Sequence, residues 1–355
     1  MTGAKSQTRR GGAAVVNVSG AVVAPLPKGV EPELPTLVAA PPTGKTWGHE
    51  IKLDGYRILA SLENGKVTLT TRGGNNWTSR MRALAEAMGT IPVKTALLDG
   101  ELVSLDARGV SDFQSLQDAL SCGPGRNARP LVYFAFDLLY LNGVDLRGVG
   151  LAQRKALLGE MLARVPHPFA STIRLSEHVI GQGPAFFTQA ARMGLEGIVS
   201  KLLHAPYRSG RSRNWLKVKC IQRQELVVVG FTDPKGTRSV LGALLLATYT
   251  GDELVYRGRV GTGFGEGSLG ELHGKLAPLR DLQPRLAHAP VGAEARKVHL
   301  VKPELVAEVS FAGFTHDGLL RHATFLGLRD DKKASEVTLE RPLAPPPPPR
   351  RQWLL

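Results

Sequence analysis

Apolar residues recur along this chain with two different spacings, and the pattern changes after Lys219. Before that point, apolar residues three to four apart predict helices over Arg80–Met88, Leu151–Leu162 and Pro184–Met193. In the same part, runs rich in β-branched and aromatic residues predict strands over Val67–Thr71, Thr95–Leu98, Leu131–Phe136 and Gly197–Lys201. Asn64-Gly65 is typical of a tight hairpin turn. We therefore expect an α+β domain over residues 31–222, built mainly from antiparallel sheets with helices.

Helical spacing is scarce in the second part of the chain, residues 223–340. Short runs at close spacing, joined by Gly-rich links, predict strands over Glu225–Phe231, Leu241–Thr248, Leu254–Val260 and Leu305–Ala312. Such a series favours a small all-β barrel. Residues 1–30 are expected to form a flexible leader. Residues 341–355 are expected to form a Pro-rich tail, in which Pro345–Pro349 favours extended polyproline II.

Charge adds a preference for polyanions without saying which one. The 355 residues carry a formal net charge of +14, and the pI is near 10.0. Such an excess raises the encounter rate with polyanions in general. Two cysteines, Cys122 and Cys220, provide neither a disulfide framework nor a zinc site.

No apolar run is long enough for a membrane span, and Arg9-Arg10 matches a twin-arginine export signal only weakly. We expect a cytoplasmic protein.

The segment Glu50-Ile51-Lys52-Leu53-Asp54-Gly55 is the first with candidate chemistry. A lysine beside acidic groups at a glycine turn can act as a covalent nucleophile once it loses its proton. The pKa of the amine, ordinarily about 10.4, must fall for this to happen. Taken alone, the segment is more often a surface salt bridge at a turn.

Five further segments with charged or aromatic side chains follow in order. The first three present Arg72 after a strand, Glu101 at a Gly turn and Phe136-Asp137 at a strand end. The fourth places Glu196 before the strand that carries Lys201, and the fifth places Lys217 and Lys219 on one strand face. Each has a structural explanation when taken singly, because aromatic residues dominate cores and lysines often line solvated strands. We expect Asp137 and Trp215 to hydrogen-bond and pack.

Together these six segments resemble the covalent nucleotidyltransferase superfamily of DNA ligases, RNA ligases and mRNA capping enzymes. Gly327–Lys332 is similar to the Arg-x-Asp-Lys motif of its C-terminal OB domain. Further segments narrow the resemblance to the ligase module of bacterial ligase D, which acts in end joining: Pro41–Glu50, Ala205–Ser212, Gly258–Phe264 and Leu320–Phe325. The resemblance covers about residues 31–340. It implies an adenylation domain followed by an OB-fold barrel.

The resemblance also implies roles for the residues that would carry the reaction. Lys52 would attack the α-phosphorus of ATP, while Lys217 and Lys219 neutralise the α-phosphate. Glu101 and Glu196 would lie near the sugar and bind Mg²⁺ or Mn²⁺. Closure of the OB domain would bring a last group to the pyrophosphate, namely Arg329, Asp331 and Lys332.

The remaining residues would bind the nucleotide or the DNA at the break. Phe136 would stack on adenine, and Glu50 would contact the edge of the base. Contacts to the rest of the nucleotide or to the DNA would come from Asp54, Arg57, Arg72 and Lys201.

The implied function is ATP-dependent sealing of DNA through a lysyl-AMP intermediate. The implied partners are nicked or broken duplex DNA, a Ku-like end-binding protein and a separate repair polymerase, and the protein would act as a monomer at the bacterial nucleoid. An RNA ligase or capping-type enzyme shares the lysine chemistry, and a non-catalytic DNA-binding module would use only the +14 charge. An NAD-dependent ligase would need a four-cysteine zinc site, which two cysteines cannot supply.

Overall fold

The computed structural model describes residues 18–121, 131–234, 241–280, 286–290, 295 and 297–344. The chain divides into two compact units, Met1–Cys220 with Pro342–Leu355, and Ile221–Arg341. The sequence places the boundary two residues later, between residues 222 and 223. Cys122, Arg9-Arg10 and the proline run Pro345–Pro349 lie outside the described residues.

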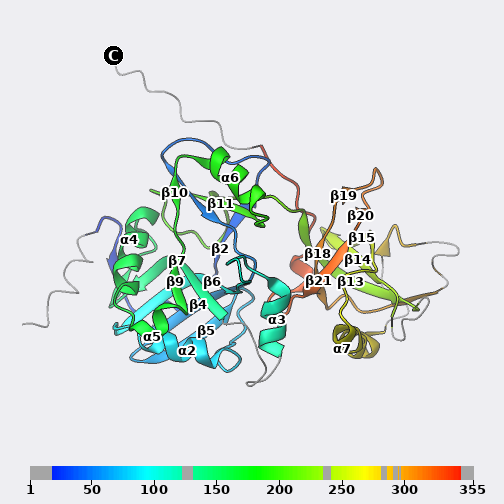
Figure 1. Cartoon of the computed structure of the whole chain (residues 1–355), viewed down its shortest axis with the longest axis horizontal. Coiled ribbons are helices and arrows are strands. Elements are labelled where there is room, and N and C mark those ends of the chain that lie inside the picture. The colour runs from blue at the N-terminus through cyan, green and yellow to red at the C-terminus, as the bar shows by residue number, and fades with distance from the viewer. Residues whose placement is uncertain are drawn as a thin grey trace, which may run out of the picture. The chain divides into compact units, whose positions relative to one another are not determined.

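The first unit contains two sheets (Figure 1). The larger has the order β1 (Val22–Val23), β8 (Val144–Asp145), β7 (Leu131–Leu141), β6 (Thr95–Ser104), β4 (Tyr56–Glu63) and β5 (Lys66–Thr71), with β9 (Ile173–Leu175) parallel to β7. The smaller has the order β10 (Val179–Ile180), β3 (Trp47–Ile51), β11 (Gly197–Leu202), β12 (Gly210–Lys219) and β2 (Glu33–Leu37). Only the β12–β2 and β7–β9 pairs in these two sheets are parallel. Both sheets are therefore mainly antiparallel, as predicted.

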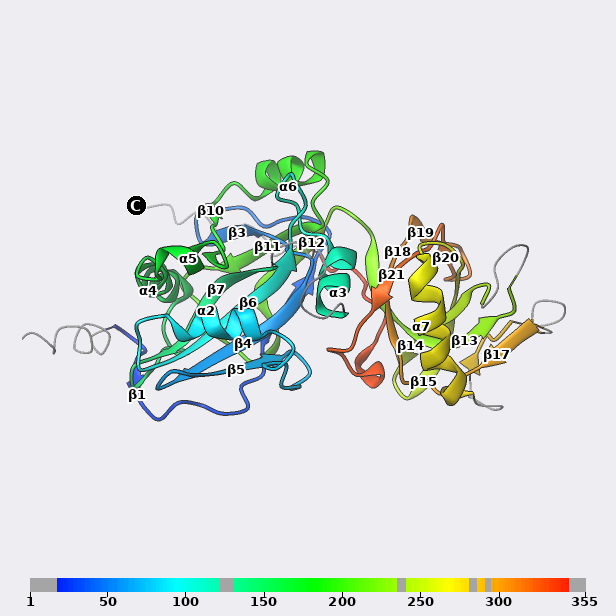
Figure 2. The same cartoon turned by 60° about the horizontal axis from the view of Figure 1, so that its bottom comes forward.

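Strand alternation gives the larger sheet two different faces. On one face, Ile58, Leu98 and Tyr133 are fully buried in the main core. That core is covered by α2 (Arg82–Gly89), α3 (Phe113–Ser121), α4 (Leu151–Leu162) and α5 (His167–Ala170), as Figure 2 shows for α2 and α4. On the other face, Leu59 and Phe136 pack against Trp215 of the smaller sheet. The two sheets thus meet across a thin apolar layer.

The smaller sheet has its own core on the side of α6 (Gly183–Arg192). Ile198, Leu216 and Val218 are buried there, and Phe186 and Phe187 of the helix pack against them. Each of the two sheets therefore packs against its own core on the face that is turned away from the other sheet.

The predicted helices agree with α2, α4 and α6, and the bounds of α4 are those predicted. The Asn64-Gly65 prediction is also confirmed, because β4 ends at Glu63 and β5 begins at Lys66. Asn64 has φ +50° and Gly65 has φ +85°, the left-handed conformations that a two-residue hairpin turn requires.

Two strands continue well past the residues predicted for them. β6 continues through Asp99-Gly100 to Ser104, and β7 continues past Asp137 to Leu141. Glu101 therefore lies within a strand and not at a Gly turn, and Phe136-Asp137 does not end a strand. Both strands shift register beside Asp99, so the backbone accommodates these residues without leaving the sheet.

The expected leader is wrong for its described part. Val22 and Val23 pair with β8, and Ala24 N donates to Gly143 O at 3.1 Å. Leu26 and Val30 pack on the apolar layer between the sheets. Residues 18–30 thus belong to the first unit, because pairing and apolar contact hold a segment whose composition alone favours a loose conformation.

The second unit is mostly β. Its main sheet has the order β16 (Leu286–Ala287), β15 (Glu253–Val260), β14 (Leu244–Thr250), β13 (Arg223–Thr232), β18 (Val306–Ser310) and β21 (Thr324–Leu328), with β17 (Val298–Leu300) on β13. A separate pair is formed by β19 (Gly313–Phe314) and β20 (Leu320–Arg321). The described helices are α7 (Glu266–Leu276) and the short 3₁₀ turns Ala277–Leu279 and Ala334–Glu336. Among the described strands, β16 and β21 remain the two ends, so these pairings do not close the predicted barrel.

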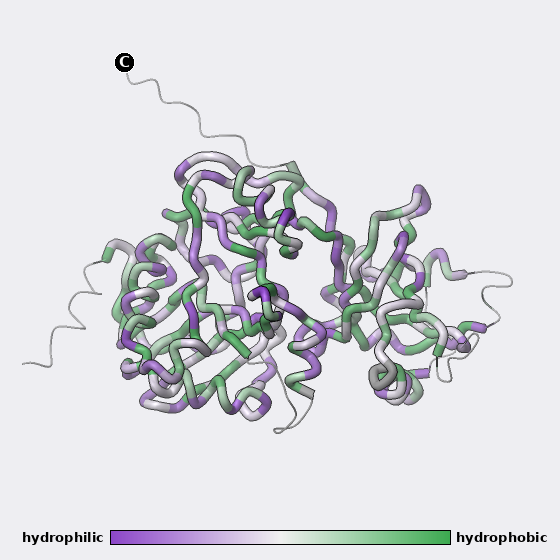
Figure 3. Tube along the Cα trace, in the orientation of Figure 1, coloured by the Kyte–Doolittle hydropathy of each residue, from purple (hydrophilic) through white to green (hydrophobic). Residues whose placement is uncertain are grey.

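Hydropathy changes over short segments along both units (Figure 3). This is the pattern of sheets and helices that bury one side. Within the described part of the chain, no helix combines the length and apolar character needed to span a membrane.

Candidate active site

A pocket of about 110 Å³ lies within the first unit, bordered by both of its sheets. Its lining residues come from β2, β3, β4, β6, β7, β11 and β12 and from the turn after β3: Pro35, Glu50, Ile51, Lys52, Leu53, Arg57, Glu101, Phe136, Val199, Lys201 and Trp215. Six of the residues predicted to form the site therefore border one cavity, although they come from five different strands and the turn after β3.

Lys52 lies directly after β3, where its backbone N–H donates to Gly197 O at 2.9 Å. Its Nζ is 2.6 Å from the carboxylate of Glu196, and 22% of its side chain is exposed. Burial alone would lower the pKa of Lys52, but the nearby carboxylates, above all Glu196, raise it above the ordinary value. The carboxylates, above all Glu196, therefore favour the ammonium form of the candidate nucleophile.

The Asp54-Gly55 turn places Lys52 against the larger sheet. Ser111 Oγ accepts a hydrogen bond from Asp54 N at 3.0 Å, and Asp54 itself is buried. A Cβ at Gly55 would lie 2.1 Å from Leu102 O, so only glycine allows this close approach. Because β3 ends at Ile51, strand alternation does not relate the side chains of Lys52 and Asp54.

Arg57 is fixed by a carboxylate that the motifs did not indicate. Its Nε and Nη2 donate to Asp99 at 2.5 and 2.6 Å, and Tyr207 Oη donates to Asp99 at 2.7 Å. Although burial opposes the charge, Asp99 raises the pKa of Arg57 above its ordinary value. The signal in the sequence is the spacing of Asp99 and Glu101, because side chains two residues apart on a strand share a face. The structure adds Arg57 to that face, since Leu59 pairs with Asp99 and Arg57 with Glu101.

Glu50 is buried in a second set of polar contacts. Lys155 Nζ donates to its Oε1 at 2.8 Å, while Ser176 Oγ and Lys201 Nζ donate to Oε2 at 2.8 and 3.0 Å. Lys155 and Ser176 were not predicted. Lys155 could have been suspected, because it lies on the buried stripe of α4 between Leu151 and Leu158.

Phe136 and Trp215 form an aromatic corner of the pocket. Their ring centroids are 5.8 Å apart at an interplanar angle of 83°. Lys201 Nζ lies 4.0 and 4.1 Å from the two ring centroids, and Arg57 Cζ lies 4.5 Å from that of Phe136. Burial, followed by the charge of Lys155, lowers the pKa of Lys201 to about 8 despite the opposing effect of Glu50. Trp215, expected to be structural, therefore also borders the candidate site.

The remaining predicted residues of the first unit lie near the pocket or apart from it. Lys217 and Lys219 are half-buried on β12, paired with Val199 and Gly197 of the strand that follows Glu196. Arg72 is half-buried directly after β5 and does not line the pocket. Asp137 receives two hydrogen bonds from the fully buried Arg154, at 2.6 and 2.7 Å, which confirms its expected structural role.

Arg329, Asp331 and Lys332 belong to the second unit. Arg329 is bound by both carboxylate oxygens of Asp331 at 2.8 Å, and Lys332 forms an ion pair with Glu225. Asp331 is 1% exposed. All three predicted residues are thus engaged in ion pairs of their own unit.

Metal binding would rely on few protein ligands. Within the described residues, no group of three or more His, Cys, Asp or Glu side chains has the arrangement of a metal site. Glu101 on the pocket wall and Glu196 beside Lys52 are the two predicted carboxylates. Two carboxylates fit Mg²⁺, which usually keeps several waters and takes further oxygen ligands from substrate phosphates.

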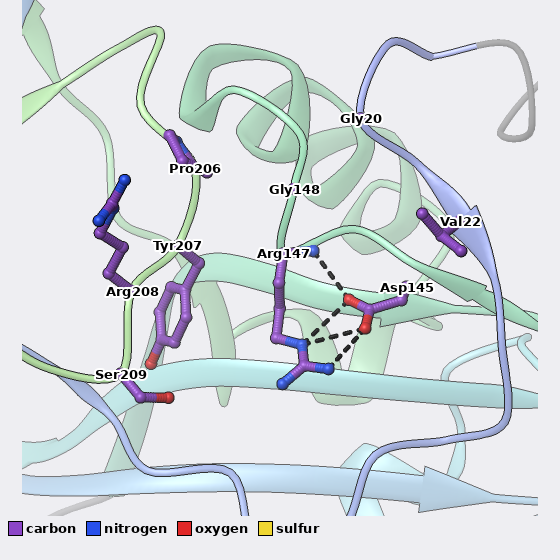
Figure 4. A pocket seen from close by; sticks show the side chains of 9 residues that line it. All are labelled: Gly20, Val22, Asp145, Arg147, Gly148, Pro206, Tyr207, Arg208 and Ser209. Carbon is purple, nitrogen blue, oxygen red and sulfur yellow. Dashed lines mark hydrogen bonds and ion pairs between the residues drawn. The ribbon is translucent and has the colours of Figure 1, made fainter.

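A second pocket has a volume of about 370 Å³ (Figure 4). Its lining residues come from three separate segments: Gly20, Val22, Asp145, Arg147, Gly148, Pro206, Tyr207, Arg208 and Ser209. The guanidinium of Arg147 is occupied by Asp145, with its closest contact at 2.6 Å. Neither Lys52 nor any other predicted site residue lines this pocket. The smaller pocket, which six predicted site residues line, is therefore the candidate site.

Comparison with known proteins identifies the family. The ATP dependent DNA ligase domain matches residues 38–219, and the ATP dependent DNA ligase C terminal region matches residues 237–332. The multifunctional non-homologous end joining protein LigD of Pseudomonas aeruginosa is 44% identical over 327 residues, covering 91% of this chain and 38% of that protein. Its counterpart in Mycobacterium tuberculosis is 38% identical over 300 residues, covering 83% and 37%.

The chain thus spans less than two fifths of the length of these two relatives. Among solved structures, mycobacterial DNA ligase D complexed with ATP and MES is 35% identical, with a TM-score of 0.64 over 88% of this chain and 98% of that one. The two family matches and this shared structure lead to one conclusion: the chain belongs to the ATP-dependent DNA ligase family.

Proposed function

We propose that this ligase seals 5′-phosphate/3′-hydroxyl breaks in DNA during double-strand break end joining, through a covalent AMP on Lys52. The observation that carries the proposal is the position of Lys52 at the edge of a pocket that combines an aromatic corner with the buried carboxylate Glu50. A related ligase domain has been solved in complex with ATP, and two relatives are named for non-homologous end joining, which supports the choice of nucleotide and pathway.

The proposed reaction has three group transfers. Lys52 Nζ attacks the α-phosphorus of ATP, and pyrophosphate leaves. The 5′-phosphate of the DNA then takes the AMP from Lys52, and finally the 3′-hydroxyl attacks that phosphate and releases AMP. The covalent stage divides one difficult step into easier ones.

The amine must lose a proton before it attacks. Glu196 holds this amine as an ion pair at 2.6 Å, so Lys52 must leave this carboxylate and give its proton to water when the nucleotide binds. As negative charge grows on the α-phosphate, Lys217 and Lys219 of the neighbouring strand would stabilise it. A divalent cation held by Glu101 and Glu196 would offset charge on the triphosphate.

Base and sugar contacts follow from the pocket wall. Adenine would lie against Phe136, with Glu50 at the edge of the base. Lys201, which contacts the ring of Phe136, would form the adjoining part of the pocket wall. Arg57 is held firmly by Asp99 and would contact the sugar or the DNA, together with Asp54 and Arg72. Pre-formed contacts of this kind lower the cost of ordering the site when the nucleotide binds.

Arg329, Asp331 and Lys332 are proposed to reach the pyrophosphate when the second unit closes over ATP. Their present ion pairs with one another and with Glu225 would then be exchanged for contacts to the substrate. We further propose that the protein acts as a monomer at the nucleoid, in the cytoplasm, with a Ku-like end-binding protein and a separate repair polymerase.

Intact-mass measurement tests the first step. Protein freed of bound nucleotide is incubated with ATP and either Mg²⁺ or Mn²⁺, and we expect the mass of one AMP to be gained. Lys52→Ala should remove the gain, whereas Lys66→Ala, which removes an exposed lysine of β5, should keep it. The absence of any adduct with both metals would refute the proposal.

Three further assays separate the alternatives. Labelling by GTP in place of ATP would indicate a capping-type enzyme. Sealing of nicked RNA in preference to nicked DNA would indicate an RNA ligase. Binding of DNA without any adduct would leave only a DNA-binding module.

A further inference from the structure

Glu50 has one hydrogen-bonding position left for a ligand. Its side chain is 4% exposed, and it borders the pocket. An ionised carboxylate offers about four lone-pair positions, two on each oxygen. Contacts among the described residues use one position on Oε1, through Lys155, and two on Oε2, through Ser176 and Lys201. The remaining position therefore belongs to Oε1, the oxygen that Lys155 holds.

Lys155 and Lys201 contact the same carboxylate in different ways. Lys201 is part of the pocket wall and covers both aromatic rings. Lys155 does not line the pocket, is 4% exposed and reaches Glu50 from α4. Its Nζ also donates to Ser176 O at 2.7 Å, so it joins α4, β3 and the segment after β9 at one point.

The two lysines keep Glu50 ionised. Burial on its own would raise the pKa of this carboxyl, yet Lys155 and then Lys201 bring it below the ordinary value. An ionised carboxylate accepts hydrogen bonds and donates none. It can accept from the 6-amino group of adenine, but a 6-oxo group would present a second acceptor to it, and an unpaired buried acceptor is costly.

We propose that Lys155 is a positioning residue that sets the purine selectivity of nucleotidyl transfer, by directing Oε1 of Glu50 toward position 6 of the base. This inference rests on the proposed function, in which Lys52 receives the nucleotide and Glu50 meets the edge of the base. It assigns a role to a residue that lies outside every nucleotidyltransferase segment found in the sequence.

ITP is a suitable probe because it carries a 6-oxo group where ATP carries an amino group. The rate of Lys52 labelling is measured with each nucleotide for the wild type and for Lys155→Met, which keeps the length of the side chain but not its charge or donors. We expect the ATP:ITP ratio of kcat/KM to fall by about tenfold or more, the range for a lost hydrogen bond to a charged group. The loss should be mainly in the KM for ATP, since kcat depends on the phosphate contacts.

Three further variants make the result specific. Lys155→Arg keeps the charge and should retain most of the preference for ATP, whereas Lys66→Met removes an exposed lysine and should leave it unchanged. Glu50→Gln should lower the ratio by itself, because an amide can donate to a 6-oxo group. If Lys155 acts through Glu50, the double variant should have the same ratio as Glu50→Gln alone.

The double variant also covers a failure of Lys155→Met to fold. It removes the charges of Lys155 and Glu50 together, and Lys201, which also pairs with Glu50, can lose its proton because its pKa is about 8. A folded Lys155→Met with the wild-type ATP:ITP ratio would overturn the inference, as would a double variant that differs from Glu50→Gln. Both results leave the proposed function standing, which fails only if the wild type gains no nucleotide on Lys52.

Discussion

At the scale of single residues, the ion pair between Lys52 and Glu196 opposes the chemistry that Lys52 is proposed to perform. The two groups are 2.6 Å apart, and the carboxylate raises the pKa of the amine although burial would lower it. A nucleophilic amine must be neutral. The ion pair with Glu196 therefore keeps Lys52 in an unreactive form, and reactivity depends on changing its partner.

Glu196→Gln should lower the pKa of Lys52 in the nucleotide-free protein. The substitution removes the strongest raising influence, while burial continues to disfavour the ammonium. The extent of Lys52 acetylation by a water-soluble anhydride, measured by peptide mass spectrometry across pH, should reach half its maximum at a lower pH than in the wild type.

Glu86→Gln is the matched control, because Glu86 is an exposed acid on α2. It should leave the acetylation curve of Lys52 unchanged. An unchanged or raised midpoint in Glu196→Gln would show that Glu196 does not hold the charge of Lys52.

At the scale of elements, the pairing of β3 with β11 buries a neutral histidine. His49 lies opposite Ser200 in the register, its Nδ1 is 2.8 Å from Ser200 Oγ, and the residue is fully buried. Burial, together with His178, lowers the pKa of His49 from 6.5 to about 4. Nε2 has no hydrogen-bond partner among the described residues, so nothing there would stabilise an added proton.

Stability should therefore fall as the pH decreases from about 6.5 towards 4. In this window the unfolded chain binds a proton at His49 that the native state does not bind, and protonation favours the unfolded chain. The thermal midpoint of the wild type should decrease between pH 7 and pH 5. His49→Asn, which can still bond to Ser200, should show a smaller decrease.

His167→Asn removes an exposed histidine of α5 and should keep the wild-type pH dependence. If His49→Asn loses as much stability between these two pH values as the wild type does, then His49 does not cause the acid sensitivity.

The local sequence pattern was sufficient to predict elements whose signals lie in one continuous segment. It was not sufficient where a residue is fixed by partners that are distant in the sequence. The apolar spacing of α4 gave its bounds, and Asn64-Gly65 gave the β4–β5 hairpin. Asp99-Gly100 suggested a turn, but Gly100 is needed for a different reason: a Cβ there would lie 2.3 Å from the ring of Tyr133. Nothing in the sequence indicated that Tyr133 of the neighbouring strand β7 packs directly against Gly100.

The same distinction applies to the site. Motifs gave the side chains that line the pocket, including Lys52, Glu101 and Phe136. They did not give the residues that hold those side chains, because Lys155 is 105 residues from Glu50 and Tyr207 is 108 residues from Asp99. Such supporting contacts depend on the assembled sheets.

At the scale of the whole molecule, the chain passes between its two units twice. It leaves the first unit after Cys220 and returns to it at Pro342. There Leu343 N donates to Leu37 O at 3.0 Å, Ala39 N donates to Leu343 O at 2.9 Å, and Arg213 Nη2 donates to Ala344 O at 3.3 Å. The start of the predicted tail thus joins the first unit, and the second unit is attached at both of its ends.

Ending the chain at Arg341 should widen the range of arrangements of the two units, because only the connection at Cys220–Ile221 would remain. Dyes at Glu63→Cys and Asp252→Cys, exposed positions in the first and second units, would report this by single-molecule energy transfer in a background without other cysteines. The distribution of transfer efficiencies should broaden. A milder variant, Leu343→Pro, removes one donor and should broaden it less. Unchanged distributions in both would show that the second connection imposes no restraint.

The aromatic corner of the pocket has a spectroscopic consequence. The ring centroid of Trp215 lies 4.1 Å from Lys201 Nζ. Because the pKa of Lys201 is about 8, this amine changes its charge near neutral pH. A charge at that distance alters the electric field at the ring, and indole emission depends on that field. A change in the protonation of Lys201, or a base lying against Phe136 as proposed, should therefore alter the emission of Trp215, which would follow occupancy without a labelled nucleotide.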